Sequence, residues 1–252
     1  MKVTLLAHSP EAEKIVAAAA KLCYSPSDIE TVMDGLTDEK TASFIEMLAS
    51  IGHESPTEHV TFTFGIEGVS RSLLAQITRH RMASFSVQSQ RYVREKMFEF
   101  VLPPEIEEIP EAKAEFLRAM EEDQKHYERL TELLKQKYAG TMDARSAEKK
   151  AIEDARFVLP NACVTKMICT MNTRSLMNFF RHRCCNRAQW EIRELAEQML
   201  REVVKVAPHL FAKAGPACYK GACPEGKMTC GKCMEMREYY RRIHAEAEEA
   251  AE

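Results

Sequence analysis

The chain has 252 residues with a net charge of −3, and 45% of them are hydrophobic and 29% charged, which is typical of a globular protein with one large or two small domains. The negative balance excludes a protein held to nucleic acid by general electrostatics, and no apolar run approaches the length of a membrane span. The start, Met1 to Ala7, is too short and too weakly basic for a signal peptide, so we expect a cytoplasmic protein without nucleic-acid or membrane partners.

The first third of the chain predicts a strand, two helices and a second strand. An apolar run at Val3–Leu6 indicates the first strand, and Ser9-Pro10-Glu11 has the cap and first turn of a helix that continues to Leu22. A second helix is expected from Thr37 to Gly52, where the glycine ends it. From His59 to Ile66 apolar residues alternate with small or polar ones, which predicts a strand with one buried face.

The stretch from Arg79 to Tyr92, RHRMASFSVQSQRY, carries arginines, a histidine, serines and glutamines but no carboxylate. Arginine can bind phosphate through two parallel hydrogen bonds, and Ser, Gln and backbone N–H groups can hold the remaining oxygens. The stretch therefore predicts a phosphorylated small-molecule ligand. A solvated basic helix face is the alternative, but the apolar residues around the run would half-bury the arginines, which then need partners.

Consecutive residues of a helix point in different directions. If the helix that begins at Ser70-Arg71 continues through Arg79, His80 and Arg81, these three side chains cannot all contact one ligand face. We therefore expect two ligands, or two subunits, at this stretch.

The second half of the chain is predicted to be mainly helical. Residues 162–171 fit either a strand or a buried helical turn. Proline-bounded or periodic patterns predict a long covering helix at Glu111–Tyr138, a shorter helix at Asp143–Phe157, a helix at Asn172–Cys185 and a core helix at Ala188–Val206.

The helix predicted at Asn172–Cys185 carries polar residues on two faces. Arg174, Asn178 and His182 recur every four residues, whereas Arg183 lies about 180° away from Arg174 at 3.6 residues per turn. A single pocket cannot easily use both faces, so either this helix ends early or the pocket is shared between subunits.

Two groups of potential metal ligands occur in the sequence. The loop from His53 to His59 has two histidines and two glutamates, but their spacing matches no recognised metal site. After Pro216, four cysteines form C-x4-C-x6-C-x2-C, of which only the last two have the spacing usual for zinc. The chain's nine cysteines are an odd number without a regular framework, so we expect reduced thiols in a flexible tail and assign no metal ligand.

Three ordered motifs resemble one family. Arg79-His80-Arg81 followed by seven residues and Ser89 is similar to the signature of the flavin-dependent thymidylate synthases, and GHESPTEH at residues 52–59 also matches that family. NTRSLMNF at residues 172–179, followed by Arg183 and by AQWE at 188–191, is the third match. The resemblance covers residues 1–216 and implies an α+β fold with a largely antiparallel central sheet covered by helices, with long helical segments. It also implies a homotetramer whose active sites are shared between subunits.

We expect residues 1–216 to form the catalytic domain and residues 217–252 a cysteine-rich tail with a terminal charged helix, Glu235 to Glu252. All the matched residues precede Arg183 or coincide with it, apart from the AQWE segment. A chain truncated after Pro216 is therefore expected to keep its ligands.

The resemblance implies a methyltransferase that converts dUMP to dTMP. Methylenetetrahydrofolate would donate the one-carbon unit, and FAD reduced by NADPH would carry the hydride, without an enzymic cysteine nucleophile. A nucleotide- and flavin-binding protein without catalysis on the same scaffold is the alternative, and the presence of His53 and Arg183 argues against it. An RNA- or zinc-binding module would predict a basic chain with aromatic platforms, which is not seen.

The resemblance also implies residue roles. Arg183 would stabilise the uracil ring ionised at nitrogen 3, His53 would lie against the flavin and folate rings, and Ser89 would act in the catalytic set as an anchor, since no adjacent histidine makes it a nucleophile. The implied FAD-binding residues are Ser55, Glu58, Arg79, His80, Arg81, Asn172, Arg174, Asn178 and His182. The implied dUMP-binding residues, several of them from a neighbouring chain, are Gln76, Arg79, Gln88, Ser89, Gln90, Arg91, Arg156 and Arg183. Val87 and Gln88 depart from the residues that many members carry, which leaves their side-chain roles open.

Overall fold

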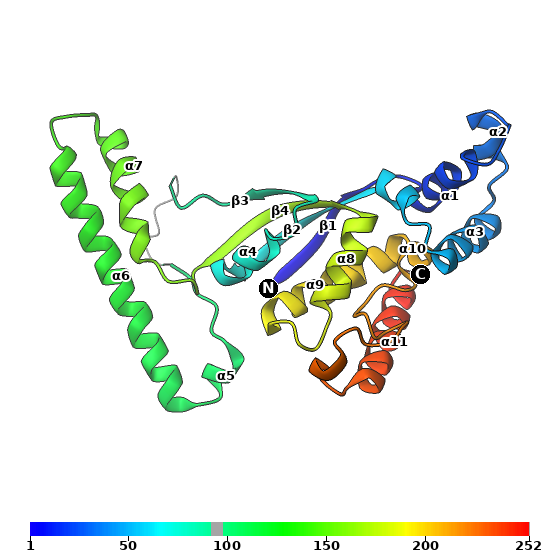
Figure 1. Ribbon diagram of the computed structural model, residues 1–252. Helices are drawn as coiled ribbons and strands as arrows, with labels where there is room; N and C mark the ends of the chain where they lie inside the picture. Colours follow the sequence, from blue (N-terminus) through cyan, green and yellow to red (C-terminus); the bar gives the residue numbers. More distant parts are fainter. Residues whose placement is uncertain (92–97, 252) are drawn as a thin grey trace. The chain divides into compact units, whose positions relative to one another are not determined.

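The computed structural model describes residues 1–91 and 98–251 (Figure 1). Tyr92, at the end of the arginine-rich stretch, and Glu252, at the end of the predicted charged helix, lie outside the described residues. Within the described ranges, none of the helices combines the length and the apolar character that crossing a lipid bilayer requires. The chain forms two compact units: the first comprises Met1–Ile66, Gln76–Ser86 and Ile168–Glu252, and the second Glu67–Ala75 and Val87–Met167.

The strands form one four-stranded antiparallel sheet in the order β1-β2-β4-β3, made of β1 (Lys2–His8), β2 (Thr61–Ser70), β4 (Val164–Asn172) and β3 (Ala83–Val87). Phe62, Phe64 and Ile66 of β2 are fully buried on one face, as the alternating pattern predicts. The ambiguous residues 162–171 are resolved as β4, in which alternate residues are buried. The α+β class and the antiparallel sheet are therefore confirmed.

Ser9 does not cap the first helix, α1 (Ala12–Leu22), so that prediction is wrong. Its N–H donates to the Thr61 carbonyl oxygen and its Oγ accepts from the Thr61 N–H, both at 3.0 Å, which closes the β1–β2 pair. Glu11 is the residue at the N-cap, with a φ of 48° and no side-chain capping bond. A serine before a proline satisfied a neighbouring strand here rather than its own helix.

The remaining helices of the first unit are short and well capped. Thr37 Oγ1 accepts from the Lys40 N–H at 3.4 Å at the start of α3, and Gly52 ends α3 with a φ of 71°, both as predicted. The helical bounds are α2 (Ile29–Asp34), α3 (Asp38–Ile51), η1 (Ser55–His59), α4 (Arg71–Ile77, whose start lies in the second unit), α8 (Thr173–Arg183), α9 (Trp190–Val206), α10 (Pro208–Phe211), η3 (Gly226–Met228) and α11 (Cys233–Glu249).

A row of aromatic side chains connects the sheet to α8 in the core of the first unit. Phe62 of β2 meets Phe211 of α10 edge to face, with ring centroids 5.3 Å apart, and Phe211 lies 6.0 Å from Phe180 of α8. Phe179 follows at 5.8 Å from Phe180 and then lies 5.0 Å from the His80 ring. Edge-to-face pairs of this kind add to the burial energy and define ring orientation, so the row fixes α8 against the sheet.

The second unit contains a long helical hairpin. Its helices are α5 (Pro104–Glu107), α6 (Pro110–Tyr138), α7 (Ala144–Ala155) and the short η2 (Arg156–Val158). Helices α6 and α7 lie side by side (Figure 1), and Tyr127 of α6 packs on Ile152 and Ala155 of α7. The long amphipathic helix predicted from Glu111 is confirmed with a start one residue earlier.

The segment after Pro216 packs into the first unit. Tyr240, Ile243 and Ala247 of α11 are buried, and α11 packs against α9. The Tyr240 hydroxyl lies 2.9 Å from both the Cys184 carbonyl oxygen and Glu197 Oε1, which share its proton. The expectation of a flexible tail is therefore wrong, and this packing argues against a core that is independent of residues 217–252.

We expect Tyr240→Phe to lower the free energy of unfolding by about 1–3 kcal/mol, because it leaves a buried carbonyl and a carboxylate without their shared donor. Urea denaturation checks this value. Tyr24→Phe is the matched control, since Tyr24 is 82% exposed. Equal stability of the Tyr240→Phe protein and the wild type would show that the network does not hold α11 in place.

Candidate functional site

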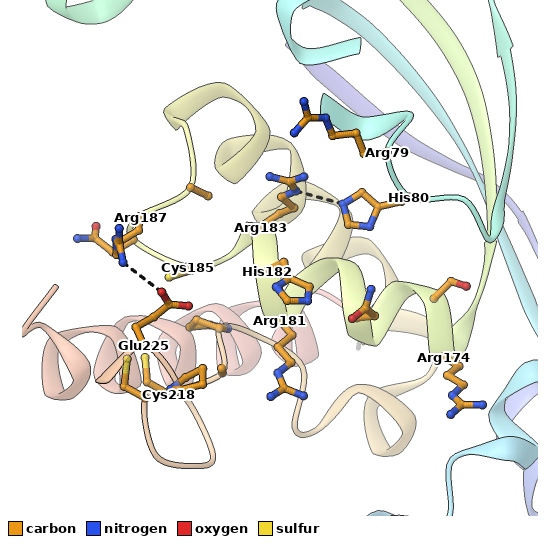
Figure 2. Close-up of a pocket in the computed structure, with 18 of the residues that line it drawn as sticks. Arg79, His80, Arg174, Arg181, His182, Arg183, Cys185, Arg187, Cys218 and Glu225 are labelled. Carbon is orange, nitrogen blue, oxygen red and sulfur yellow. Dashed lines mark hydrogen bonds and ion pairs between the residues drawn. The ribbon is translucent and has the colours of Figure 1, made fainter. Parts of the chain in front are cut away.

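A cavity of about 900 Å³ lies in the first unit and is lined mainly by arginine and other polar side chains (Figure 2). Its walls come from three segments that are far apart in the sequence: the loop after α4, the face and C-terminal end of α8, and the segment from Pro216 to Met236. Its basic lining residues are Arg79, His80, Arg81, Arg174, Arg181, His182, Arg183 and Arg187.

The loop after α4 brings three predicted residues to the cavity together. Helix α4 ends at Ile77, and the His80 N–H donates to the Ile77 carbonyl oxygen at 3.0 Å in the following turn. Arg79, His80 and Arg81 therefore lie outside the helix, and all three line the cavity. The prediction that they cannot meet one ligand is wrong because it assumed that the helix continues.

Helix α8 also places both of its polar faces at this cavity. Asn172 caps α8, with its Oδ1 accepting from the Ser175 N–H at 2.8 Å, and the helix ends at Arg183. Arg174, Asn178, His182 and Arg183 all line the cavity. Of the two alternatives left open by the sequence, the early helix end is the one that the structure shows, and the view that one pocket cannot easily use both faces is wrong.

Positive charge in the cavity exceeds negative charge. Glu58 pairs with Arg174 at 2.5 Å and Glu225 pairs with Arg187 at 3.1 Å. Among the residues that the structure describes, no carboxylate forms an ion pair with Arg79, Arg81, Arg181 or Arg183. Burial and the neighbouring charge of Arg79 lower the pKa of Arg183. Such a cavity is suited to an anionic ligand.

Arg183 is held by His80. Its Nε donates to His80 Nε2 at 3.1 Å (Figure 2). Burial, followed by the charges of Arg183 and His182, lowers the pKa of His80 to about 4. The imidazole is therefore neutral near pH 7 and carries its proton on Nδ1, since Nε2 accepts. His80 thus acts as a fixed acceptor that orients the Arg183 guanidinium.

A second cavity of about 640 Å³ in the first unit has a more apolar lining from α1, α3, α8 and α10. His53 lines this cavity, and Arg174 borders both cavities. The His53 ring lies edge to face with Tyr24, at a centroid distance of 6.5 Å. Ser55 is exposed at the start of η1 and is absent from the lining of both cavities as the described residues form them.

Several predicted nucleotide-binding residues form a separate group in the second unit. Arg91 Nη2 lies 2.7 Å from Glu153 Oε1, and Arg156 Nε donates to the Glu153 carbonyl oxygen at 3.0 Å. Ser89 Oγ accepts from the Arg91 N–H at 3.2 Å. The structure thus brings Ser89, Arg91 and Arg156 together around Glu153, a residue that the sequence reasoning missed.

The predicted glutamines have structural partners. The Gln88 N–H donates to the Lys166 carbonyl oxygen at 3.0 Å, and its own carbonyl oxygen accepts from Arg71 Nη2 at 2.9 Å. Gln90 is half-buried. In the first unit, Gln76 Nε2 donates to Gln189 Oε1 at 3.4 Å.

Arg181 and Arg187 line the main cavity but were not predicted. A sequence signal existed, because Arg181-His182-Arg183 repeats the triplet Arg79-His80-Arg81. The two triplets meet through the Arg183–His80 hydrogen bond.

Known proteins resemble this chain over most of its length. The family described as thymidylate synthase complementing protein matches residues 4–209. The flavin-dependent thymidylate synthase of Clostridium tetani is 58% identical, over 95% of this chain and 97% of the relative. That of Geobacter sulfurreducens is 45% identical, over 96% of this chain and 99% of the relative.

A solved structure shares the fold. It is the UMP/dUMP methylase PolB from Streptomyces cacaoi bound with 5-Br dUMP, which has a TM-score of 0.66, is 24% identical and covers 85% of this chain and 95% of that chain. At this identity the likeness shows the fold alone. The three motifs, both groups of candidate residues and the curated relatives agree, and the chain therefore belongs to the family described as thymidylate synthase complementing protein.

Proposed function

We propose that the protein is a flavin-dependent thymidylate synthase, a methyltransferase that converts dUMP to dTMP with methylenetetrahydrofolate as carbon donor and FAD, reduced by NADPH, as hydride carrier. The observation that carries the proposal is the cavity in which Arg79 and Arg183 have no carboxylate partner among the described residues. The names of the relatives at 58% and 45% identity support it.

The main cavity fits FAD by size and by charge. Its volume of about 900 Å³ is at the upper end of the range for ligand pockets. The diphosphate of FAD is anionic, and arginine forks and amide groups are suitable donors to it. When bound and reduced, FAD supplies the hydride. The residues proposed to hold it are Ser55, Glu58, Arg79, His80, Arg81, Asn172, Arg174, Asn178 and His182.

Arg183 is proposed to act on the pyrimidine ring. Its guanidinium is preorganised by the hydrogen bond to neutral His80, so little reorientation is needed when charge develops on the substrate. A fixed cation at the ring edge stabilises negative charge at nitrogen 3 and thereby raises electron density at carbon 5.

His53 is proposed to position the folate ring. It lines the second cavity, whose more apolar wall suits a planar aromatic group, and Arg174 at the border gives that cavity a cation beside the FAD site. Alignment of the two rings is a positioning effect, which is the contribution expected of a protein whose cofactor carries the chemistry.

Nucleotide phosphate is proposed to bind at the group in the second unit. The Arg91–Glu153 ion pair is 43% and 37% exposed, and pairs of this kind contribute only about 0–1 kcal/mol. A phosphate can therefore replace Glu153 as the partner of Arg91 at low cost. Ser89, Gln88, Gln90, Arg91 and Arg156 are proposed to act from a neighbouring subunit of a homotetramer, together with Gln76, Arg79 and Arg183.

Tritium release from dUMP labelled at carbon 5 tests the activity when FAD, NADPH and methylenetetrahydrofolate are all present. Release that requires each of the three components is expected. Binding of FAD and dUMP without release would favour the alternative, a protein that binds nucleotide and flavin without catalysis. A cytoplasmic location remains a prediction.

We expect Arg183→Ala to retain FAD but to lower dTMP formation by at least about 100-fold, because a preorganised cation at the developing charge is lost. Flavin absorbance and tritium release are measured together. Arg181→Ala is the control, since Arg181 lines the same cavity but is exposed. Equal losses in both variants, or simultaneous loss of FAD from Arg183→Ala, would contradict the role of Arg183.

We expect His80 to make stability depend on pH. Because the pKa of His80 in the folded state, about 4, lies below the ordinary value of 6.5, the unfolded chain binds the proton first as the pH falls. The contribution of His80 is fully present above about pH 6.5 and declines towards pH 4, by about 1–2 kcal/mol after allowance for solvent screening.

Urea denaturation at pH 7 and pH 5 checks this dependence. His80→Gln should lose less stability between the two pH values than the wild type does. His126→Gln, at an exposed histidine, should behave like the wild type. If His80→Gln keeps the full pH dependence, the neutral state of His80 does not determine it.

We expect Ser89→Ala to raise the KM for dUMP by about 5- to 10-fold through the loss of one hydrogen bond, with turnover still measurable at saturation. Steady-state tritium release separates the two parameters. A folded, inactive protein that still binds dUMP would show that Ser89 is a nucleophile.

A further inference from the structure

The cysteine-rich segment forms part of the wall of the main cavity. Cys218, Cys223 and Cys230 line the cavity together with Cys185, and Cys233 is the first residue of α11 (Figure 2 labels Cys185 and Cys218). The Cys233 thiol donates a hydrogen bond to Cys223 and accepts one from Cys218. The proposed methylation uses none of these thiols.

The cluster is better arranged for thiol chemistry than for metal binding. Among the described residues, no group of three or more His, Cys, Asp or Glu side chains is placed to hold a metal ion. All the cysteines described are free thiols. Direct contact between two thiols is the geometry from which a disulfide forms with little movement.

The three thiols differ in reactivity. Hydrogen bonds from the Thr229 side chain, the Glu225 backbone and Cys233 lower the pKa of Cys223. Burial, followed by the charge and hydrogen bond of Cys233, raises the pKa of Cys218 to about 11. Since the thiolate is the reactive form, Cys223 is the nucleophile of the cluster and Cys233 is the neighbour in position to resolve it.

The loop that carries Cys223 is held in place by two arginines. Arg187 Nη1 donates to the Met228 carbonyl oxygen at 2.6 Å and pairs with Glu225, which neutralises the carboxylate nearest Cys223. Arg237 donates to the carbonyl oxygens of Cys218 and Gly221, both at 2.8 Å. The Cys223–Cys233 contact therefore belongs to an ordered loop.

We propose that Cys223 and Cys233 are a peroxide-sensitive pair that forms a disulfide in the wall of the main cavity. The Cys223 thiolate attacks a hydroperoxide such as hydrogen peroxide, takes up one oxygen to become sulfenic acid, and releases water after protonation of the leaving hydroxide. The Cys233 sulfur then attacks the Cys223 sulfur, and its proton leaves with the hydroxyl group as a second water. Two thiols are oxidised, and one peroxide is reduced.

The test uses the full-length protein, purified with a reductant that is then removed, and hydrogen peroxide as the probe. Intact mass and peptide mapping after alkylation should show the loss of two hydrogen atoms and one cross-linked peptide containing Cys223 and Cys233. Cys223→Ser should slow this loss at least about tenfold. Cys23→Ser is the control and should leave it unchanged, because Cys23 lies at the exposed C-terminal end of α1.

A second variant separates the two steps. In Cys233→Ala the sulfenic acid at Cys223 has lost its resolving thiol and should be trapped by dimedone, which the wild type should resist. Oxidation confined to Cys23, a cross-link that persists in Cys223→Ser, or no dimedone adduct in a folded Cys233→Ala would overturn the proposal. Zinc that co-purifies with the wild type and is lost from Cys223→Ser would overturn it as well. None of these measurements needs flavin or dUMP, so they are independent of the proposed methylation.

Discussion

The hydrogen bond from Arg183 Nε to His80 Nε2 determines how positive charge is presented in the main cavity. It requires an unprotonated ring, which in turn depends on burial of His80. The ring lies against Phe179, and Phe179 belongs to the aromatic row that passes through Phe180 and Phe211 to β2. The core of the first unit therefore sets both the protonation state of the acceptor and the direction of the guanidinium.

Charges that have protein partners stand beside charges that have none. Glu58 and Glu225 neutralise Arg174 and Arg187 at the edges of the cavity, whereas Arg79 and Arg183 repel each other across its wall. Holding like charges close together destabilises the folded chain, and an anionic ligand relieves that repulsion on binding. Part of the affinity for an anion is thus stored in the folded protein before the ligand arrives.

Periodic patterns and motifs in the sequence predicted β2, the long helix α6 and the ends of α3, because each depends on local side-chain spacing or a single cap. The ends of α4 and α8 were not predicted, since neither Ile77 nor Arg183 is followed directly by glycine or proline, and the assumed helices then misplaced the cavity residues. Partners distant in sequence were also missed. Glu153 for Arg91 and Thr61 for Ser9 depend on tertiary contacts that no local pattern records.

Arg174 is a wall shared by two cavities of different character. Glu54 and Glu58 hold its guanidinium from one side, and both carboxylates are largely exposed. A ligand that displaces this side chain from either cavity changes the shape and the charge of the other. Thermodynamic linkage makes such an effect reciprocal, so the order in which two ligands arrive cannot alter its size. Occupancy of the two cavities is coupled through a single rotamer.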